Sequence, residues 1–375
     1  MVKGIHMTLM VGPAVPIPVS KDVLDALTDL QVTVTSGQAS GFRLTFKMDN
    51  QSALPAIFLL AAGSIVPIVR VIIVVTLNGV SEVIMDGVMT NYEISSGSDS
   101  SQTTLTVIGE DLSRLMDYFD FSGIPYPCMP PFARVALVLA KYAVLGIVPK
   151  VIPSVMVDVP LPTERIPRHK GKDLTYIKSL AEKVGYVFYI EPGPVPGTSV
   201  AYWGPEIKVG VPQPALNVNM DAHTNVESLN CSFNSDEKKL PIVFIQEPNS
   251  KAIIPIPIPD ITPLNPPLGA LPPIPKGIEP IDETAKESPV KAALIGLAKA
   301  AKMSDVVSAS GSLNVLRYGR VLKARRLVGV RGAGTAFDGL YYVSSVTHTI
   351  KRGEYKQDFT LTRNGLISTI PKVPV

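Results

Sequence analysis

Proline is the feature that most constrains the fold of this chain. The 375 residues contain 35 prolines, and 11 of them lie between Pro248 and Pro280. Each proline removes a backbone N–H donor and fixes φ, so it interrupts both helices and central strands. We therefore expect many turns and extended connections, exclude long helical bundles, and predict polyproline II or edge-strand backbone for residues 248–280.

Composition excludes several classes of protein. Apolar residues make up 46% of the chain and charged residues 18%, which is too apolar for a disordered chain. The length indicates two or three domains. A formal net charge of +3 is too small for nucleic acid or anionic lipid to be the main partner, so we expect protein partners. Two cysteines, Cys128 and Cys231, exclude a disulfide framework, although one bridge between them stays open.

One segment is apolar enough to raise the question of a membrane span. Residues Ala53 to Val75 carry a single charge, Arg70, over 23 positions, and that length would cross a bilayer. Two prolines and a glycine interrupt the segment, and its second half is rich in β-branched residues. We predict a buried turn or loop followed by a core strand, and no membrane insertion. The apolar stretch from Met7 to Val19 contains three prolines and is expected to be an extended arm, not a signal peptide.

Strand patterns dominate both ends of the chain. Between Phe42 and Met48 apolar and polar residues alternate with a period of two, as they do on a strand with one buried face. Asn78-Gly79 favours a two-residue hairpin turn, so we predict that 71–77 pairs with 80–94. A further strand is expected at 102–108, with a short helix after Gly109. The alternation recurs at 355–362.

The middle of the chain has mixed character. We predict helices at Phe132–Leu145 and from Asp173, as its cap, to Val184. Strands are expected at 186–190 and 199–203, which makes this region a small α+β unit. Another helix is predicted from Pro289 to Lys302.

One strand-hairpin-strand pattern occurs twice. In the first copy Asp86-Gly87 precedes a polar loop and a threonine-rich strand with Thr106; in the second, Asp338-Gly339 precedes a loop and Thr360. The interval from Asp to Thr is 20 residues in one copy and 22 in the other. Coincidence is the alternative, because Asp-Gly turns and threonine-rich strands are common in antiparallel sheets. We favour duplication, with both Asp-Gly pairs at turn positions.

These segments also carry a family resemblance. Residues 83–90 and 105–116 resemble the first tube domain of the late control protein D family of phage-tail baseplate hubs. Residues 173–190, a helix ending in Leu180-Ala-Glu-Lys-Val-Gly-Tyr186, resemble the family's central signature, and 337–350 with 355–366 resemble its second tube domain. The matches extend from about 30 to 366, and their order is more specific than any single motif.

The resemblance implies a mainly β fold with an α+β insertion and two tube-like antiparallel β-barrel modules per chain. In this family three chains form a pseudo-sixfold ring. Such a homotrimer presents near-sixfold symmetry to a hexameric tube or tube-initiator proteins, and threefold symmetry to a spike. The family serves contractile tails, extracellular contractile injection systems and, fused to a spike, the VgrG proteins of type VI secretion. Ten residues follow Gly365, so we expect a separate trimeric spike protein, with other baseplate proteins as further partners.

The expected role is structural: no enzyme and no cofactor, in a phage virion or injection particle assembled in the cytoplasm. A tail-associated peptidoglycan hydrolase is the alternative, but it would need a catalytic carboxylate or metal cluster. The four histidines lie singly, and we expect His348 at a barrel surface or an interface. Glu110 and Asp111 are explained as residues at a helix start. No Gly-x-Ser-x-Gly motif is present.

The densest charge cluster lies between residues 317 and 331, a range that contains no acidic residue. Only Tyr318 is close enough in sequence to stack a base, which disfavours nucleic acid. We predict a solvated barrel face, a ring wall or a subunit interface. The cluster comprises Arg317, Arg320, Lys323, Arg325, Arg326 and Arg331.

We predict four parts in the chain. Residues 1–120 are the first tube-like β domain, and 121–225 the central α+β domain. Residues 226–290 contain a strand and the proline-rich segment, whose isoleucines we expect to pack on a neighbouring subunit or baseplate protein. Residues 291–375 are the second tube-like β domain, with strands from about 226–246.

Overall fold

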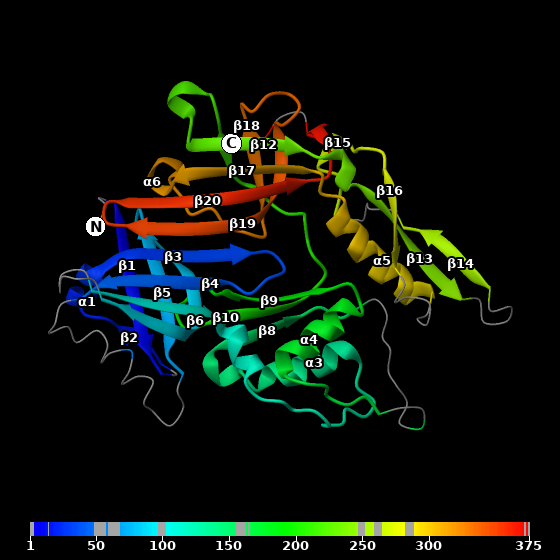
Figure 1. The fold of residues 1–375 in the computed structure, drawn as a ribbon, viewed down its shortest axis with the longest axis horizontal. Helices are drawn as coiled ribbons and strands as arrows, with labels where there is room; N and C mark the ends of the chain where they lie inside the picture. The colour runs from blue at the N-terminus through cyan, green and yellow to red at the C-terminus, as the bar shows by residue number, and fades with distance from the viewer. Residues whose placement is uncertain are drawn as a thin grey trace.

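The fold is built mainly from antiparallel strands. The computed structural model describes residues 4–13, 15–48, 58, 68–96, 103–154, 163, 166–246, 252–258, 265–281, 289–370 and 373. Figure 1 shows a large sheet through the middle of the molecule, a helical unit on one side of it and a small sheet at one end. Among the described residues the large sheet has 13 strands and follows an open path from β12 to β2. One chain by itself therefore shows no closed barrel in its described part.

The N-terminal half of the large sheet confirms the predicted strands. Phe42 and Phe46 are buried on the alternating strand β4, and Asn78-Gly79, with φ of 51° and 83°, joins β5 to β6 as a hairpin. The apolar N-terminal arm is extended, as expected, and pairs with β5. The elements are β1 (Ile5–Gly12), β2 (Ile17–Pro18), α1 (Lys21–Ala26), β3 (Leu27–Thr35), β4 (Gly41–Lys47), β5 (Arg70–Leu77), β6 (Val80–Ser95) and β7 (Thr104–Asp111).

The C-terminal half contributes the remaining strands of the large sheet. Its last hairpin, β19–β20, confirms the strand predicted from the alternation at 355–362. The elements are β11 (Gln213–Asn217), β12 (Val226–Phe233), β17 (Val307–Asn314), α6 (Val315–Tyr318), β18 (Leu327–Arg331), β19 (Gly339–Lys351) and β20 (Glu354–Arg363).

The two halves pair their strands in the same order. In the N-terminal half the ladder runs β3-β4-β7-β6-β5, and every neighbouring pair is antiparallel. In the C-terminal half it runs β12-β17-β20-β19-β18, again wholly antiparallel. We call these the first ladder and the second ladder. They meet where β3 pairs with β19.

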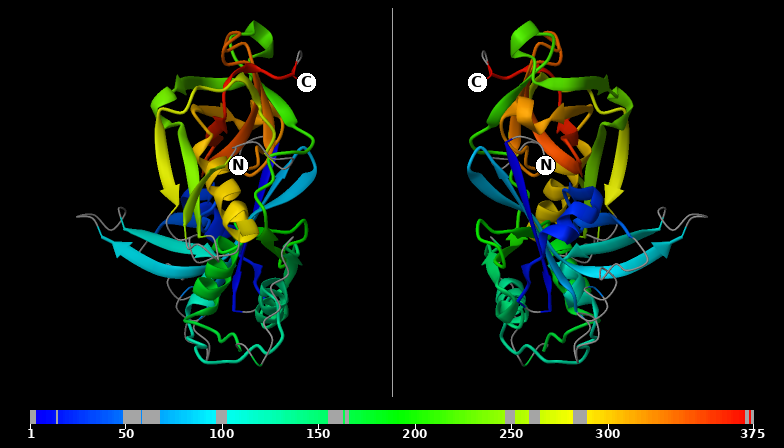
Figure 2. Two further views of the ribbon diagram at one scale, coloured as in Figure 1. Left: turned by 90° about the vertical axis from the view of Figure 1, so that its right-hand side faces the viewer. Right: turned by 90° about the vertical axis from the view of Figure 1, so that its left-hand side faces the viewer.

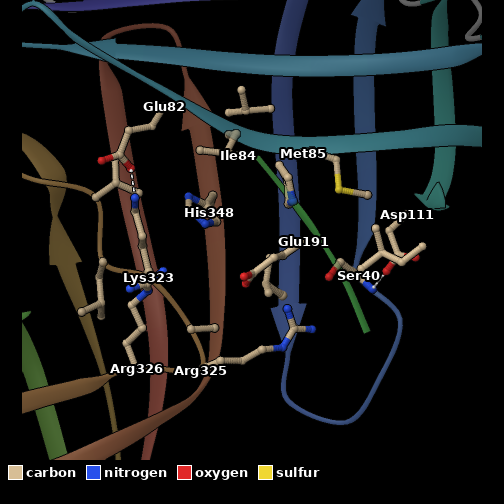
Figure 3. A pocket seen from close by; sticks show the side chains of 17 residues that line it. Ser40, Glu82, Ile84, Met85, Asp111, Glu191, Lys323, Arg325, Arg326 and His348 are labelled. Atoms are coloured by element: carbon tan, nitrogen blue, oxygen red, sulfur yellow. Dashed lines mark hydrogen bonds and ion pairs between the residues drawn. The ribbon is translucent and has the colours of Figure 1, made fainter. Parts of the chain in front are cut away.

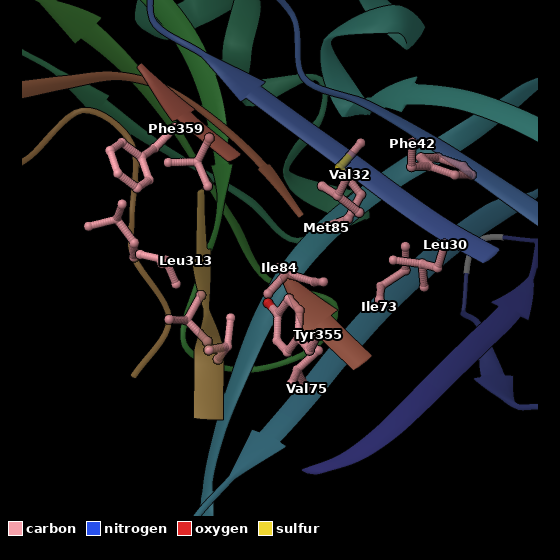
Figure 4. Close-up of a cluster of buried hydrophobic side chains, with 14 of the residues drawn as sticks. Leu30, Val32, Phe42, Ile73, Val75, Ile84, Met85, Leu313, Tyr355 and Phe359 are labelled. Atoms are coloured by element: carbon pink, nitrogen blue, oxygen red, sulfur yellow. The ribbon is translucent and has the colours of Figure 1, made fainter. Parts of the chain in front are cut away.

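A shared hydrophobic core lies beneath both ladders. Figure 4 shows side chains of the first ladder, such as Val32 and Ile73, in one cluster with Leu313, Tyr355 and Phe359 of the second. All five are buried. Because these residues come from both ends of the chain, the two ladders form one continuous packed body.

The helical unit has a separate core around the buried Trp203. Its predicted helices and strands are confirmed within a few residues, but Asp173 is not a cap: the N-cap is Lys172, and the buried Asp173 carboxylate accepts a hydrogen bond from Tyr142 instead. The elements are η2 (Leu112–Asp117), α3 (Pro131–Ala140), η3 (Ala143–Leu145), β8 (Ile147–Val151), α4 (Asp173–Glu182), β9 (Val187–Pro192), β10 (Ser199–Gly204) and η4 (Asp221–His223).

The proline-rich segment forms edge strands where it is described. Strand β14 flanks β13 on one side and β16 flanks it on the other, while α5 packs against β13. Ile258 donates its N–H to Pro241 O. Successive backbone nitrogens along a strand point to opposite sides, so the nitrogens of Pro255 and Pro257 point away from β13, where no hydrogen-bond donor is needed. The elements are η5 (Ser235–Glu237), β13 (Lys239–Gln246), β14 (Ile253–Pro257), β15 (Gly269–Leu271), β16 (Gly277–Ile281), α5 (Pro289–Met303) and β21 (Leu366–Ser368).

The apolar segment from Ala53 to Val75 is described only in part. Residues 53–57 and 59–67, where we predicted a turn or loop, lie outside the described residues. The second part is strand β5, almost wholly buried, and this confirms the predicted core strand. Among the helices that the structure describes, none has the length and apolarity to cross a bilayer.

Candidate functional site

The structure divides the predicted charge cluster among three places. Arg317 and Arg320 are exposed in and just after α6, and Arg331 ends β18, beside β11. Lys323, Arg325 and Arg326 line a cavity that lies between the two ladders and the helical unit. Only these last three residues are brought to one site.

This cavity has a volume of about 140 Å³. Figure 3 shows that cations and carboxylates both line it: a dashed line joins Glu82 to Lys323, and Glu191 and Arg325 lie to one side of this pair. The Lys323 ammonium lies 3.2 Å from the Glu82 carboxylate. Because the lining contains carboxylates as well as cations, the cavity carries no large excess charge to attract an anionic ligand.

Arg325 joins the helical unit to both ladders. Its guanidinium lies over the Tyr189 ring of β9, 4.1 Å from the ring centroid, and donates a hydrogen bond to Thr35 O at 3.0 Å. The backbone N–H of Arg325 bonds to Val343 O. Burial raises the pKa of Tyr189, so the ring stays neutral beneath the cation. The φ of Arg325 is 62°, a strained conformation for a side chain of this size that the surrounding contacts must hold.

A second cavity of about 290 Å³ is lined by both Arg325 and Tyr189. It shares Arg325, Arg326 and Glu191 with the first cavity and adds Lys150 and Tyr342. Both cavities therefore adjoin Arg325, whose contacts join the two ladders to Tyr189 of β9.

The first predicted Asp-Gly pair forms a second joint. Both oxygens of the buried Asp86 carboxylate accept hydrogen bonds from Arg70, at 2.8 and 2.7 Å. Ser199 of β10 donates a further bond to Asp86 at 2.9 Å, and Arg70 reaches Gly197 O at 3.1 Å. The carboxylate and the guanidinium satisfy each other in the interior, as a buried ion pair must, and together they attach the helical unit to the first ladder.

The prediction that Asp86-Gly87 is a turn is wrong. Both residues lie within β6, opposite Ile72 and Val71 of β5. A side chain at Gly87 would place Cβ 2.2 Å from Glu110 O, so glycine is needed for close strand approach and not for a turn. The missed signal was Arg70, the single charge of its apolar segment and the partner of Asp86.

The second Asp-Gly pair has a different role. Asp338 follows a turn and accepts a hydrogen bond from Ala333 N at 2.8 Å. Gly339 begins β19 with a φ of 138°. Arg363 lies nearby, but its guanidinium donates to the carbonyl oxygens of Asp338 and Ala336, at 2.9 Å each, and not to a carboxylate. Here the aspartate closes a turn.

His348 also differs from its prediction. We expected it at a barrel surface or an interface, and it is buried in β19, within hydrogen-bond distance of Tyr355 (2.7 Å). Burial lowers its pKa to about 4, so the imidazole is neutral at pH 7. His348 lies opposite the buried Val32 of β3, on the buried face of the sheet, and its ring lines the first cavity.

Neighbouring carboxyls have ordinary structural roles. Asp111 caps η2, as predicted, by accepting from Ser113 N, and it also accepts from Ser40 N at 2.6 Å. Burial raises its pKa, while these hydrogen bonds oppose the shift. Cys128 and Cys231 are both free thiols. Across the described part of the chain, no group of three or more His, Cys, Asp or Glu residues is arranged to hold a metal ion.

The small sheet carries an exposed apolar face. Because paired strand residues share a face, the face opposite Val243 and the helix α5 bears Ile253 and Pro255 of β14 and Ile278 of β16. These three residues are exposed. An exposed apolar face of this kind is typical of a surface that contacts another protein.

No protein-family model and no curated protein matches this sequence. Solved structures do match over almost the whole chain. A tail protein from Neisseria meningitidis MC58 is 14% identical, with a TM-score of 0.62, and the match covers 97% of this chain and 98% of that one. A 43 kDa tail protein of prophage MuSo2 from Shewanella oneidensis is 13% identical, with a TM-score of 0.60, covering 96% and 98%.

A third match is a chain of a Francisella PdpA–VgrG complex. It is 9% identical, with a TM-score of 0.59; the match covers 100% of this chain and 55% of that one, so this chain spans about half its length. These identities are low, and the likeness is one of fold. The chain thus has the fold of phage tail proteins and of part of a VgrG-complex chain.

Proposed function

From this shared fold we propose that the chain is a structural baseplate hub of a contractile phage tail or an extracellular contractile injection system. The observation that carries the proposal is that two ladders of the same order and orientation occur in one chain. Three chains would supply six similar blocks around one axis. Such a ring matches a sixfold tube on one side and a threefold spike on the other.

In this proposal the ladders belong to the two tube-like domains, 1–120 and 291–375 with its strands from about 226–246, and closure of the barrels requires neighbouring chains. The open strand path of a single chain is consistent with that requirement. The domain at 121–225 is held to the first ladder through Arg70 and Asp86. The exposed residues Arg317 and Arg320 are the members of the charge cluster that remain for contacts between subunits.

The proposed partners are two further copies, a separate trimeric spike protein, a hexameric tube or tube-initiator protein, and other baseplate proteins. The role is non-enzymatic. Support comes from the cavities between the ladders and the helical unit, where Lys323 pairs with Glu82 and Arg325 stacks on Tyr189. Groups that satisfy each other in this way hold a joint together and are not poised for reaction with a substrate.

Mass photometry tests the proposal. We expect the purified chain, alone at high concentration or with its spike protein, to form particles of three times the 40.2 kDa chain mass. A monomer under both conditions would contradict the hub. Zymography on peptidoglycan supplies the enzymatic control, with no clearing expected from this chain.

A further inference from the structure

The small sheet β14-β13-β16 is an addition that only the second ladder carries. In the shared strand order, β12 and β17 correspond to β3 and β4. Residues 36–40 connect β3 to β4, whereas residues 234–306 separate β12 from β17, and this longer stretch contains the small sheet and α5. One chain therefore has two ladders but one small sheet. Three chains in a ring would carry six ladders and three small sheets.

The small sheet lies beyond the ends of the strands of the second ladder. Figure 1 shows it at one end of the longest axis of the molecule. Figure 2 shows it, in green and yellow, at the margin of the molecule, with α5, in gold, on its inner side. The ladders meet edge to edge, where β3 pairs with β19, so neighbouring blocks of the proposed ring stand side by side across the strands. An element beyond the strand ends then lies at a rim of the ring and not between two blocks.

The face of the small sheet turned away from α5 is largely apolar. Val243 and Ile245 mark the face that packs against α5, and residues next to them in sequence point to the other side. Because paired residues share a face, the strand register identifies the members of this other side, which we call the apolar face. It comprises Leu240, Ile242, Phe244, Ile253, Pro255, Pro257, Ile278 and Pro280. None of these residues carries a charge, and Ile253 and Ile278 are each 64% exposed.

The free edge of β14 disfavours the addition of a further strand. The backbone nitrogens that point away from β13 include those of Pro255 and Pro257. Proline has no N–H, so a strand placed along this edge would find two hydrogen-bond donors missing. A partner at β14 is therefore better served by packing its side chains on the apolar face than by strand pairing. The charged pair Lys239–Glu279 lies on the α5 side of the sheet and leaves the apolar face free of charge.

Symmetry and charge together select the partner. A hexameric tube presents six equivalent surfaces, and small sheets on alternate blocks of the ring would meet only three of them. A trimeric spike presents three surfaces and meets every small sheet in the same way. A charged surface placed against the apolar face would lose its hydration without a compensating partner. The complementary surface is therefore uncharged and apolar.

We infer that the apolar face of the small sheet is the docking surface for the separate trimeric spike protein, with one uncharged, apolar surface of the spike seated on each of three small sheets. The inference rests on the proposed function, which supplies both the ring and the spike. It gives the proline-rich segment a role in binding. Covering Ile253 and Ile278 removes apolar surface from water, and this favours binding in proportion to the area covered.

Photocrosslinking tests which protein covers the apolar face. In a background of Cys128→Ser and Cys231→Ala, the variant Ile278→Cys is labelled with benzophenone maleimide, mixed with its spike protein and the tube protein, and irradiated. The expected product joins one copy of this chain to one spike chain. Ile254→Cys is the matched control, because Ile254 is also exposed, at 46%, but lies on the α5 side of β14. It should link to the spike at least tenfold less.

The other outcomes separate this inference from the hub itself. A product that joins two copies of this chain, or this chain to the tube protein, would overturn the spike as the occupant of the apolar face. Equal linking from Ile254→Cys would overturn the assignment to that face. Trimeric particles that bind the spike without linking from Ile278→Cys would overturn the docking surface and leave the hub proposal standing. A chain that stays monomeric and binds no spike would overturn both.

Affinity measurements supply an independent test. Ile253→Ser combined with Ile278→Ser should weaken binding to immobilised spike protein at least tenfold in biolayer interferometry, because two large apolar side chains are lost from the contact. The melting temperature of the chain should stay unchanged, because both side chains are exposed. Ile254→Ser, on the α5 side of the same strand, should leave spike binding unchanged. Unaltered spike binding by the double variant would overturn the inference.

Discussion

The two ladders share a strand order and differ in what their matched aspartates do. In the first ladder Asp86 is buried inside a strand and pairs with Arg70, and Ser199 extends this network into the helical unit. In the second ladder Asp338 closes a turn before the strand begins. The same dipeptide, Asp-Gly, serves an ion pair in one place and a turn in the other.

This difference shows which feature of the chain is repeated. The ladders agree in strand order and orientation, while the aspartates of the two Asp-Gly pairs make different contacts. The first ladder uses its aspartate to carry the helical unit, and the second uses its arginine, Arg363, to hold the loop before β19. A site inferred by copying residue roles from one ladder to the other would therefore be wrong.

The largest expected effect comes from breaking the Asp86 ion pair. Asp86→Ala leaves the guanidinium of Arg70 in the interior without its charge partner, and we expect a loss of about 3–5 kcal/mol in the free energy of unfolding. Asp338→Ala removes one hydrogen bond at the surface of a turn and should cost about 1 kcal/mol. Urea unfolding followed by circular dichroism measures both.

The fluorescence of Trp203 reports unfolding of the helical unit in the same experiment. This residue is the single tryptophan of the chain and is buried in the helical unit, on the strand that also carries Ser199. Its fluorescence should change at lower urea in Asp86→Ala than in Asp338→Ala, because only the first variant loosens the joint to that unit. Equal losses in the free energy of unfolding in the two variants would contradict the different roles given to Asp86 and Asp338.

A smaller effect should depend on pH and arise from His348 of the second ladder. The pKa of buried His348 is about 4, and the ordinary value in an unfolded chain is about 6.5. Between these values the unfolded chain binds a proton that the folded chain does not, so stability falls as pH falls through this window. Linkage gives a loss of about 2 kcal/mol between pH 7 and pH 5.

The variant His348→Gln should reduce this slope of stability against pH. His223→Gln is the matched control, because His223 is exposed and its replacement should leave the slope unchanged. Chemical denaturation at a series of pH values measures the slope, and an unchanged slope in His348→Gln would show that the imidazole is not the source.

Local patterns were enough to predict most elements of the fold. Alternation identified β4 and β20, and Asn78-Gly79 located the first hairpin. Proline spacing placed the segment around Pro255 at a sheet edge. In each case a property of a few adjacent residues decides the structure. The pairing of β3 with β19 joins residues about 300 positions apart, and no local pattern carries that information.

The joints were predictable only in part. The cluster from Arg317 to Arg331 was visible as a run of cations, but which of them meet Glu82 and Tyr189 depends on the return of the chain through β9. Arg70 stood out as the single charge in an apolar segment, yet its partner lies on another strand. The prediction for His348 was wrong because the threonines beside it point to the other face of the strand, while His348 shares its face with the buried Val32 of β3.

The central claim is that the two ladders of one chain act as two of six blocks in a ring. Electron microscopy of the purified assembly with its spike protein tests this most directly. The account predicts class averages along the axis with six similar lobes around an opening, three bearing the helical unit of the first ladder in an alternating pattern. Averages with three lobes, one per chain, or with a twofold dimer would contradict it.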